Sequence, residues 1–192
     1  MSLLAARLPR LTLSAAEAPT IAVPDDQAIV RDAIRGGRAA FEELYRRYAR
    51  MVHGILLARV APQDAEDLVQ DVFITVFEKI STVRDAQAFP AWLAAIARNR
   101  ATEFYRNSRM RTEAIEQAVR DTRQAPGTSG AEILAVIRSL PEAYRETLVL
   151  RLVEGMTGPE IASRTGLTPD SVRVNLFRGM KLLRERLEGK GK

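Results

Sequence analysis

The residues best suited to chemistry are arginines that lie among aromatic and amide side chains near the middle of the chain. Residues 98–111 hold a single acid, Glu103, and five arginines, Arg98, Arg100, Arg106, Arg109 and Arg111, with Asn99, Phe104 and Tyr105 between them. Guanidinium groups contact phosphates and aromatic rings stack on unpaired bases, so the pattern is typical of single-strand binding. The alternative is a solvated basic helix around core residues, a place we expect Trp92 and Ile96 to take.

A second group of cations lies near the C-terminal end of the sequence. The cations are Arg173, Arg178 and Lys181, and Asn175 and Phe177 lie between them. On a helix in the major groove, such cations contact phosphates, and arginine bonds guanine O6 and N7. Phe177 is placed either against a thymine methyl or in local packing. The alternative for the whole group is an ordinary solvated face.

Helix signals before this second group predict a helix-turn-helix. Thr157 and Glu160 have the spacing of a capping box, and Gly166 suits the left-handed position at a helix end. Thr168 then precedes Pro169, which favours a new helix at that point. Two helices joined by a short turn of this kind place the second helix in the major groove.

The segment 64–78 has the opposite charge. It contains five acids, Asp64, Glu66, Asp67, Asp71 and Glu78, and no basic residue. An acidic helix repels DNA, so we interpret it as a protein-docking surface that includes Gln70 and Phe73, with a solvated acidic face as the alternative.

Composition excludes several function classes. The chain has 192 residues, a net charge of +5, no cysteine and one histidine, His53. Cysteine-based and histidine-rich metal sites are therefore impossible, and the sequence has no Gly-rich phosphate loop. We predict no cofactor, no metal, no small-molecule substrate and no catalytic residue. The chain also lacks an apolar run long enough to cross a membrane, and its composition suits the cytoplasm.

The elements that position these groups are helices. Apolar residues recur at spacings of three and four, and strand alternation is absent, so we predict an all-α fold of two small helical domains joined by a flexible linker. The predicted organisation is a flexible extension (1–24), a helix bundle (25–110), a breaker-rich linker (111–130), the helix-turn-helix domain (131–188) and a tail (189–192). The polar loop 81–88 divides the last two helices of the first bundle.

Three motifs resemble those of a known family. Asp64-Ala-Glu-Asp-Leu-Val-Gln-Asp-Val-Phe and Phe89-Pro-Ala-Trp-Leu-Ala-Ala-Ile-Ala-Arg-Asn-Arg-Ala are similar to region 2 of sigma-70 factors. Leu140-Pro-Glu-Ala-Tyr-Arg-Glu-Thr-Leu-Val-Leu-Arg-Leu-Val-Glu-Gly-Met-Thr is similar to the start of region 4. The short linker favours the extracytoplasmic-function (ECF) group.

The resemblance implies a division of roles. It implies that region 2 docks on the β′ clamp helices of core RNA polymerase, that promoter DNA is held at a −10 and a −35 element, and that the β subunit and an anti-sigma protein are further partners. The residues implied are Asp67, Gln70, Asp71 and Phe73 for docking; Arg98, Asn99, Arg100 and Arg106 for the −10 element and melting; and Arg173, Asn175, Phe177, Arg178 and Lys181 for the −35 element.

Two departures and one rival interpretation remain. Many relatives carry a basic residue where Asn175 stands and an alanine where Gly179 stands, so the −35 sequence cannot be inferred. The rival is a conventional dimeric helix-turn-helix regulator, which would leave the acidic helix and the arginine-aromatic helix unexplained.

Overall fold

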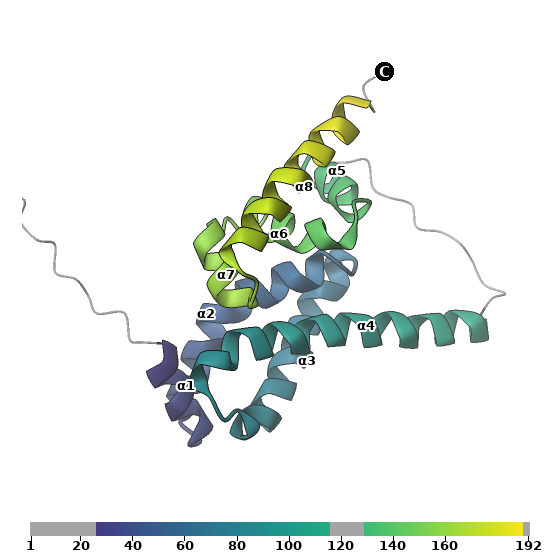
Figure 1. The fold of residues 1–192 in the computed structure, drawn as a ribbon. Coiled ribbons are helices and arrows are strands. Elements are labelled where there is room, and N and C mark those ends of the chain that lie inside the picture. Colours follow the sequence, from purple (N-terminus) through teal and green to yellow (C-terminus); the bar gives the residue numbers. More distant parts are fainter. Residues whose placement is uncertain (1–25, 116–128, 190–192) are drawn as a thin grey trace, which may run out of the picture.

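The fold is entirely helical over the residues that the computed structural model describes, 26–115 and 129–189, as the sequence predicts. The predicted extension, most of the linker and the end of the tail lie outside these residues. Figure 1 shows the order of the helices. They are α1 (Asp26–Ile34), α2 (Arg38–Leu57), α3 (Pro62–Lys79), η1 (Ile80–Thr82), η2 (Ala86–Ala88), α4 (Phe89–Ile115), α5 (Ser129–Arg138), α6 (Glu142–Leu152), α7 (Gly158–Thr165) and α8 (Pro169–Gly189).

Helices α1 to α4 form the first bundle around one face of α2. Leu44, Tyr48 and Ile55, which are four and seven residues apart and so share one face of the helix, are almost completely buried, and Phe89 packs edge-on against Tyr48. Burial of a large apolar side chain of this kind stabilises a fold by about 1.5–3 kcal/mol. Helix α3 begins at Pro62 instead of the expected Asp64, because proline fits the first turn, where its missing N–H is not needed.

Helices α5 to α8 form the second bundle, in which α6 and α8 approach closely. Gly179 of α8 makes this approach possible, since a Cβ atom there would lie 3.0 Å from Leu148 Cδ1 and 3.1 Å from Tyr144 Cβ. This contact supplies a physical reason for the glycine, which costs helix stability by itself.

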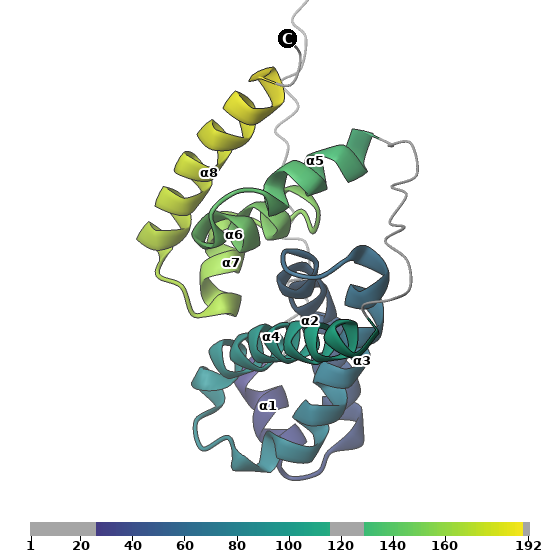
Figure 2. The same ribbon diagram turned by 90° about the vertical axis from the view of Figure 1, so that its right-hand side faces the viewer.

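The two bundles pack against each other, which the sequence analysis did not predict. Helix α6 lies on α2 and helix α7 lies on α4, as both ribbon views show (Figures 1 and 2). The contact is close at Gly54 of α2, where a Cβ atom would come within 2.6 Å of Leu150 Cδ2. Buried residues of both bundles form one continuous core.

Candidate nucleic-acid and partner surfaces

The helix-turn-helix is fixed by the predicted local signals. The Thr157 and Glu160 capping box is formed in both directions, with Glu160 Oε2 accepting from the Thr157 N–H at 2.7 Å. These bonds to the backbone and hydroxyl of Thr157 lower the pKa of the Glu160 carboxyl. Gly166 has φ +76°, and the Thr168 hydroxyl accepts from the Ser171 N–H at 3.1 Å. The turn therefore holds the start of α8 in a defined direction.

Helix α8 presents a stripe of exposed side chains. Arg173, Phe177 and Lys181 follow one another at intervals of four residues, and Arg178 lies beside them. Phe177 is 75% exposed, an unusual state for an aromatic side chain that packs locally. Arg173 pairs only with Asp170 of its own first turn, at 3.1 Å, and both are exposed. Such a pair contributes little, so the guanidinium can exchange it for a phosphate.

Asn175 is placed apart from this stripe. Two residues beyond Arg173, it lies about 200° around the helix, towards the packed side, and it is half-buried. The structure thus brings together four of the five residues predicted for duplex reading and separates the fifth.

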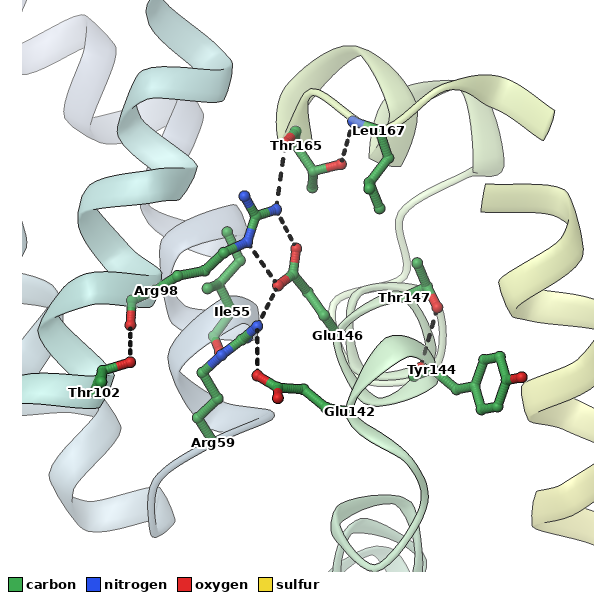
Figure 3. Close-up of polar contacts among 10 residues, drawn as sticks. All are labelled: Ile55, Arg59, Arg98, Thr102, Glu142, Tyr144, Glu146, Thr147, Thr165 and Leu167. Carbon is green, nitrogen blue, oxygen red and sulfur yellow. Dashed lines mark hydrogen bonds and ion pairs between the residues drawn. The ribbon is translucent and has the colours of Figure 1, made fainter. Parts of the chain in front are cut away.

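Helix α4 uses its arginines internally. Arg98 donates from Nε to Glu146 Oε2 at 3.0 Å and from Nη2 to Glu146 Oε1 at 2.7 Å, which is a two-pronged bond to helix α6. Its Nη2 also reaches the carbonyl of Thr165 at 3.3 Å (Figure 3). The bonded carboxylate raises the pKa of Arg98 and outweighs the opposing effect of burial.

Arg100 is engaged on the other side of α4. Its Nη2 bonds Asp71 Oδ2 of α3 at 2.5 Å, and its Nη1 lies 3.5 Å from Glu103 Oε2. The hydrogen bond to Asp71 is the main reason that the pKa of Arg100 is raised. Asn99 and Arg106 are exposed. Of the four residues predicted for the −10 element, two face solvent and two have partners in the protein.

The predicted docking residues on α3 are likewise divided between the surface and the core. Asp67 and Gln70 are exposed and Asp71 is half-buried, but Phe73 is only 4% exposed and packs against Tyr45, with ring centroids 4.6 Å apart. Phe73 therefore belongs to the bundle core in this structure and not to its surface. The apolar side chains that α3 does expose are Ile74 and Phe77, and Phe77 is 65% exposed.

Helical spacing indicates which side of α3 is buried. The buried positions of α3 recur as Leu68, Val69, Val72, Phe73 and Val76, a stripe with the spacing of three and four. Phe73 lies within this stripe, Phe77 lies at its edge, four residues further on, and Ile74 lies outside it.

Neither a metal site nor a membrane span is found in the part of the chain that the structure describes. Within residues 26–115 and 129–189, no three or more Asp, Glu or His side chains are grouped to hold an ion, and none of the helices is long and apolar enough to cross a bilayer.

Comparisons with known proteins agree with this arrangement. The profile of Sigma-70 region 2 matches residues 44–111, and that of Sigma-70, region 4 matches residues 130–183. RNA polymerase sigma factor CarQ of Myxococcus xanthus is 31% identical over 163 residues, which cover 79% of this chain and 91% of CarQ. ECF RNA polymerase sigma factor SigF of Caulobacter vibrioides is 30% identical and aligns over 84% of this chain and 93% of its own length.

Solved structures share the fold. CnrH, in complex with the cytosolic domain of CnrY, is 23% identical with a TM-score of 0.59, covering 85% of this chain and 97% of CnrH. The sigma factor RpoE of Bartonella quintana, in complex with the anti-sigma factor NepR, is 21% identical with a TM-score of 0.52, covering 77% and 96% of the two chains.

The two helical bundles, the second with a helix-turn-helix, match the two conserved regions of a class of transcription initiation factors. The chain belongs to the sigma-70 family, and within it to the ECF group of RNA polymerase sigma factors. It therefore directs RNA polymerase to promoters and supports promoter-specific initiation.

Proposed function

We propose that three surfaces of this sigma factor divide the work of initiation between polymerase docking, −10 DNA and −35 DNA. The observation that carries the proposal is the separation of charge on the described surface. Helix α3 exposes carboxylates, whereas the outer stripe of α8 exposes cations. A negative surface repels DNA and a positive one attracts it, so the two helices suit different partners.

The stripe on α8 is proposed to read the −35 element in the duplex. Arg173, near the start of the helix, is placed where helix-turn-helix proteins contact base edges. Arg178 and Lys181 contact phosphates, and Phe177 contacts a thymine methyl. Asn175 supports the packed side of α8 and has at most a peripheral contact with DNA.

The −10 element is proposed to be held by α4 and the loop 81–88 before it. Asn99 and Arg106 are exposed and available to a displaced strand. Arg98 and Arg100 join them once their carboxylate partners exchange for phosphates. Extruding each base from the stack costs a few kcal/mol. Contacts that hold the unstacked bases offset this cost and so favour opening.

Polymerase docking is proposed for the exposed face of α3. Asp67 and Gln70 form its polar part, Asp71 contributes from its bond with Arg100, and Ile74 with Phe77 adds an apolar centre. A buried aromatic anchor with polar residues around it is the usual composition of an energetic hot spot. Phe73 is left out because it is already buried.

The remaining assignments follow from membership of the family. We propose that the chain has no catalytic residue, that the polymerase supplies the chemistry, and that the protein acts in the cytoplasm with the β′ and β subunits. An anti-sigma protein is a proposed partner, because the similar structures of CnrH and RpoE contain such complexes. A dimeric regulator is not favoured, since both sigma regions match in order.

The test is initiation with purified core polymerase and genomic promoters identified by start-site mapping. The chain should form a complex with core enzyme and start RNA at defined sites. The double variant Asp67→Asn, Gln70→Ala should weaken core binding about tenfold or more and leave the melting temperature unchanged, because both side chains are exposed. Glu132→Gln, a change of charge at an exposed position of α5 away from this face, is the control. Equal affinity of the double variant and the parent would refute the docking surface.

A further inference from the structure

Two exposed residues of α8 lie within its cationic stripe but have no part in the −35 contacts proposed above. At about 100° per residue, the arc from Arg173 to Arg178 covers about 140° of the helix surface, and Asp170 and Val174 fall inside it, at about 60° and 100° from Arg173. Figure 2 shows α8 at one edge of the second bundle. A duplex that contacts the cations therefore also meets these two side chains.

Val174 forms an apolar ridge with Phe177, three residues further along the helix. Val174 is 38% exposed and Phe177 is 75% exposed, whereas Val172 and Leu183, at 1% and 4%, mark the side of α8 that faces the core. An apolar ridge between cations adds nothing to the binding of phosphates. In the major groove, its counterpart is the C5-methyl group of thymine.

Asp170 places a carboxylate on a surface that otherwise attracts DNA. It repels phosphates, so it opposes the sequence-independent part of the binding. Base edges offer it a partner that the backbone does not, because a carboxylate accepts from the N4 amino group of cytosine. An acid inside the DNA-facing arc therefore favours a particular sequence at the expense of non-specific affinity.

The geometry of the Asp170 and Arg173 pair matches one base pair. Nη2 of Arg173 lies 3.1 Å from Oδ1 of Asp170. Cytosine N4 and guanine O6 are about 3 Å apart in a C·G pair, because they are hydrogen-bonded to each other. The carboxylate can accept from N4 while the guanidinium donates to O6 and N7. An A·T pair also places a donor beside an acceptor, but only guanine presents two adjacent acceptors to a guanidinium.

The order of the residues along α8 sets the order of the contacts. Val174 lies about 6 Å beyond Asp170 along the helix axis. Successive base pairs are about 3.4 Å apart, so Val174 faces a pair one or two steps from the pair that Asp170 and Arg173 contact.

We propose that Asp170 and Val174 determine which −35 elements this sigma factor selects. Asp170, together with Arg173, selects a C·G pair, and Val174, together with Phe177, selects a thymine methyl group one or two pairs away. This inference rests on the proposed role of α8 at the −35 element and adds two residues to it.

Selection of −35 sequences by the holoenzyme tests the C·G pair. Core polymerase with the full chain is offered a mapped promoter whose −35 element is randomised, and the bound DNA is sequenced. The parent should prefer C·G at one position by about tenfold, the usual cost of one mismatched pair. Asp170→Asn should shift that preference towards A·T, since asparagine bonds adenine N6 and N7. Glu132→Gln, the same loss of charge at an exposed position of α5, should keep the parental preference.

Removal of single methyl groups tests Val174. Deoxyuridine in place of a thymine of the selected element removes the C5-methyl group and nothing else. At the thymine that faces Val174, the parent should lose about fourfold in affinity, the equivalent of one buried methyl group. Val174→Ala should be almost insensitive to this change. Leu187→Ala, at an apolar position of α8 that is 39% exposed and lies outside the arc, should respond as the parent does.

The outcomes separate this proposal from the proposed role of α8. Selected elements without the C·G pair, or with the same pair in Asp170→Asn, would refute the role of Asp170. An equal effect of deoxyuridine in the parent and in Val174→Ala would refute that of Val174. In either case, a −35 preference that Arg178→Ala weakens would leave the proposed function intact, whereas a holoenzyme without any −35 preference would overturn both. Both side chains are exposed, and unchanged melting temperatures would show that the variants are folded.

Discussion

Helices α4 and α8 both carry arginines, but they use them differently. In α4, Arg98 and Arg100 are bonded to carboxylates of other helices, at 2.7 and 2.5 Å. In α8, Arg173, Arg178 and Lys181 are exposed, and Arg173 and Lys181 pair with Asp170 and Glu185 of the same helix. A cluster of basic residues in a sequence therefore does not reveal whether its charges serve folding or binding; the carboxylates brought near by the fold decide this.

The largest expected difference between the arginines of α4 and α8 is in their contribution to the free energy of unfolding. Arg98→Ala leaves the buried Glu146 with Arg59 alone, and we expect it to lower the free energy of unfolding by about 2 kcal/mol, because removing one partner leaves a poorly compensated charge. Arg178→Ala, at an exposed position, should change it by less than about 0.5 kcal/mol.

Thermal unfolding of both variants measures this contrast. A loss of about 2 kcal/mol corresponds to about 4–8 °C for a chain of this size. Equal melting temperatures for the two variants would show that the bonds of Arg98 do not contribute to folding, and the comparison of α4 with α8 would lose its physical basis.

The next contrast is in DNA binding by the holoenzyme. Arg178→Ala should weaken −35-dependent binding by about 1–3 kcal/mol if Arg178 bonds a base, or lower the slope of log affinity against log salt by about 1 if it bonds a phosphate. Initiation from a pre-melted template, which needs no strand opening, should be unaffected. Filter binding over a salt series distinguishes the two modes, and an equal loss on pre-melted DNA would contradict a −35 role. Ser163→Ala, exposed on α7, is the matched control.

The local part of this arrangement was predictable from sequence. Thr157, Glu160 and Gly166 act within one turn of chain, and the structure confirms each of them. Trp92 and Ile96 are partly buried and pack against the core, as expected, because helical spacing of apolar residues indicates the buried face.

The long-range part was not predictable. Glu146 lies 48 residues from Arg98, and nothing in its neighbourhood marks it as buried. Phe73 and Phe77 are aromatic residues four positions apart on the same acidic helix, so neither composition nor spacing alone shows that the first is buried and the second exposed. The docking of the two bundles depends on complementary charges that act only after each bundle has formed.

A smaller expected effect is the dependence of the contact between the two bundles on pH. The hydrogen bond that His53 donates to Glu154, aided by the charges of Glu154 and Glu66, raises the pKa of His53 despite its partial burial. The protonated form is therefore favoured while the two bundles are in contact, and its contribution is complete below the ordinary pKa of about 6.5 and is lost as pH rises through the raised value. Arg50 also faces Glu154 but stays charged throughout.

We expect the contact between the two bundles to gain about 0.5–1 kcal/mol on lowering the pH through this range, as is usual for a partly exposed ion pair. The melting temperature, recorded between about pH 6 and pH 8.5, measures the change. His53→Gln should abolish the pH dependence; if it persisted in that variant, another group would be responsible.

The smallest contrast concerns the side of α8 that faces away from the cations. Its exposed stripe is held outward because the opposite face packs closely on α6 through Gly179, where an added Cβ would meet Leu148 and Tyr144 at 3.0–3.1 Å. Gly130 of α5, in contrast, has no atom within 4 Å of such a Cβ. Both are helical, so alanine should improve helix propensity equally, by up to about 1 kcal/mol.

The two glycines should therefore respond with opposite signs. Gly130→Ala should raise the melting temperature slightly, whereas Gly179→Ala should lower it slightly, because Leu148 is fully buried and cannot move aside without loss of packing. Differences of about 0.5 kcal/mol are expected in each direction. Stabilisation by both changes would mean that α6 and α8 separate easily, and that the outward stripe of cations does not depend on this close contact.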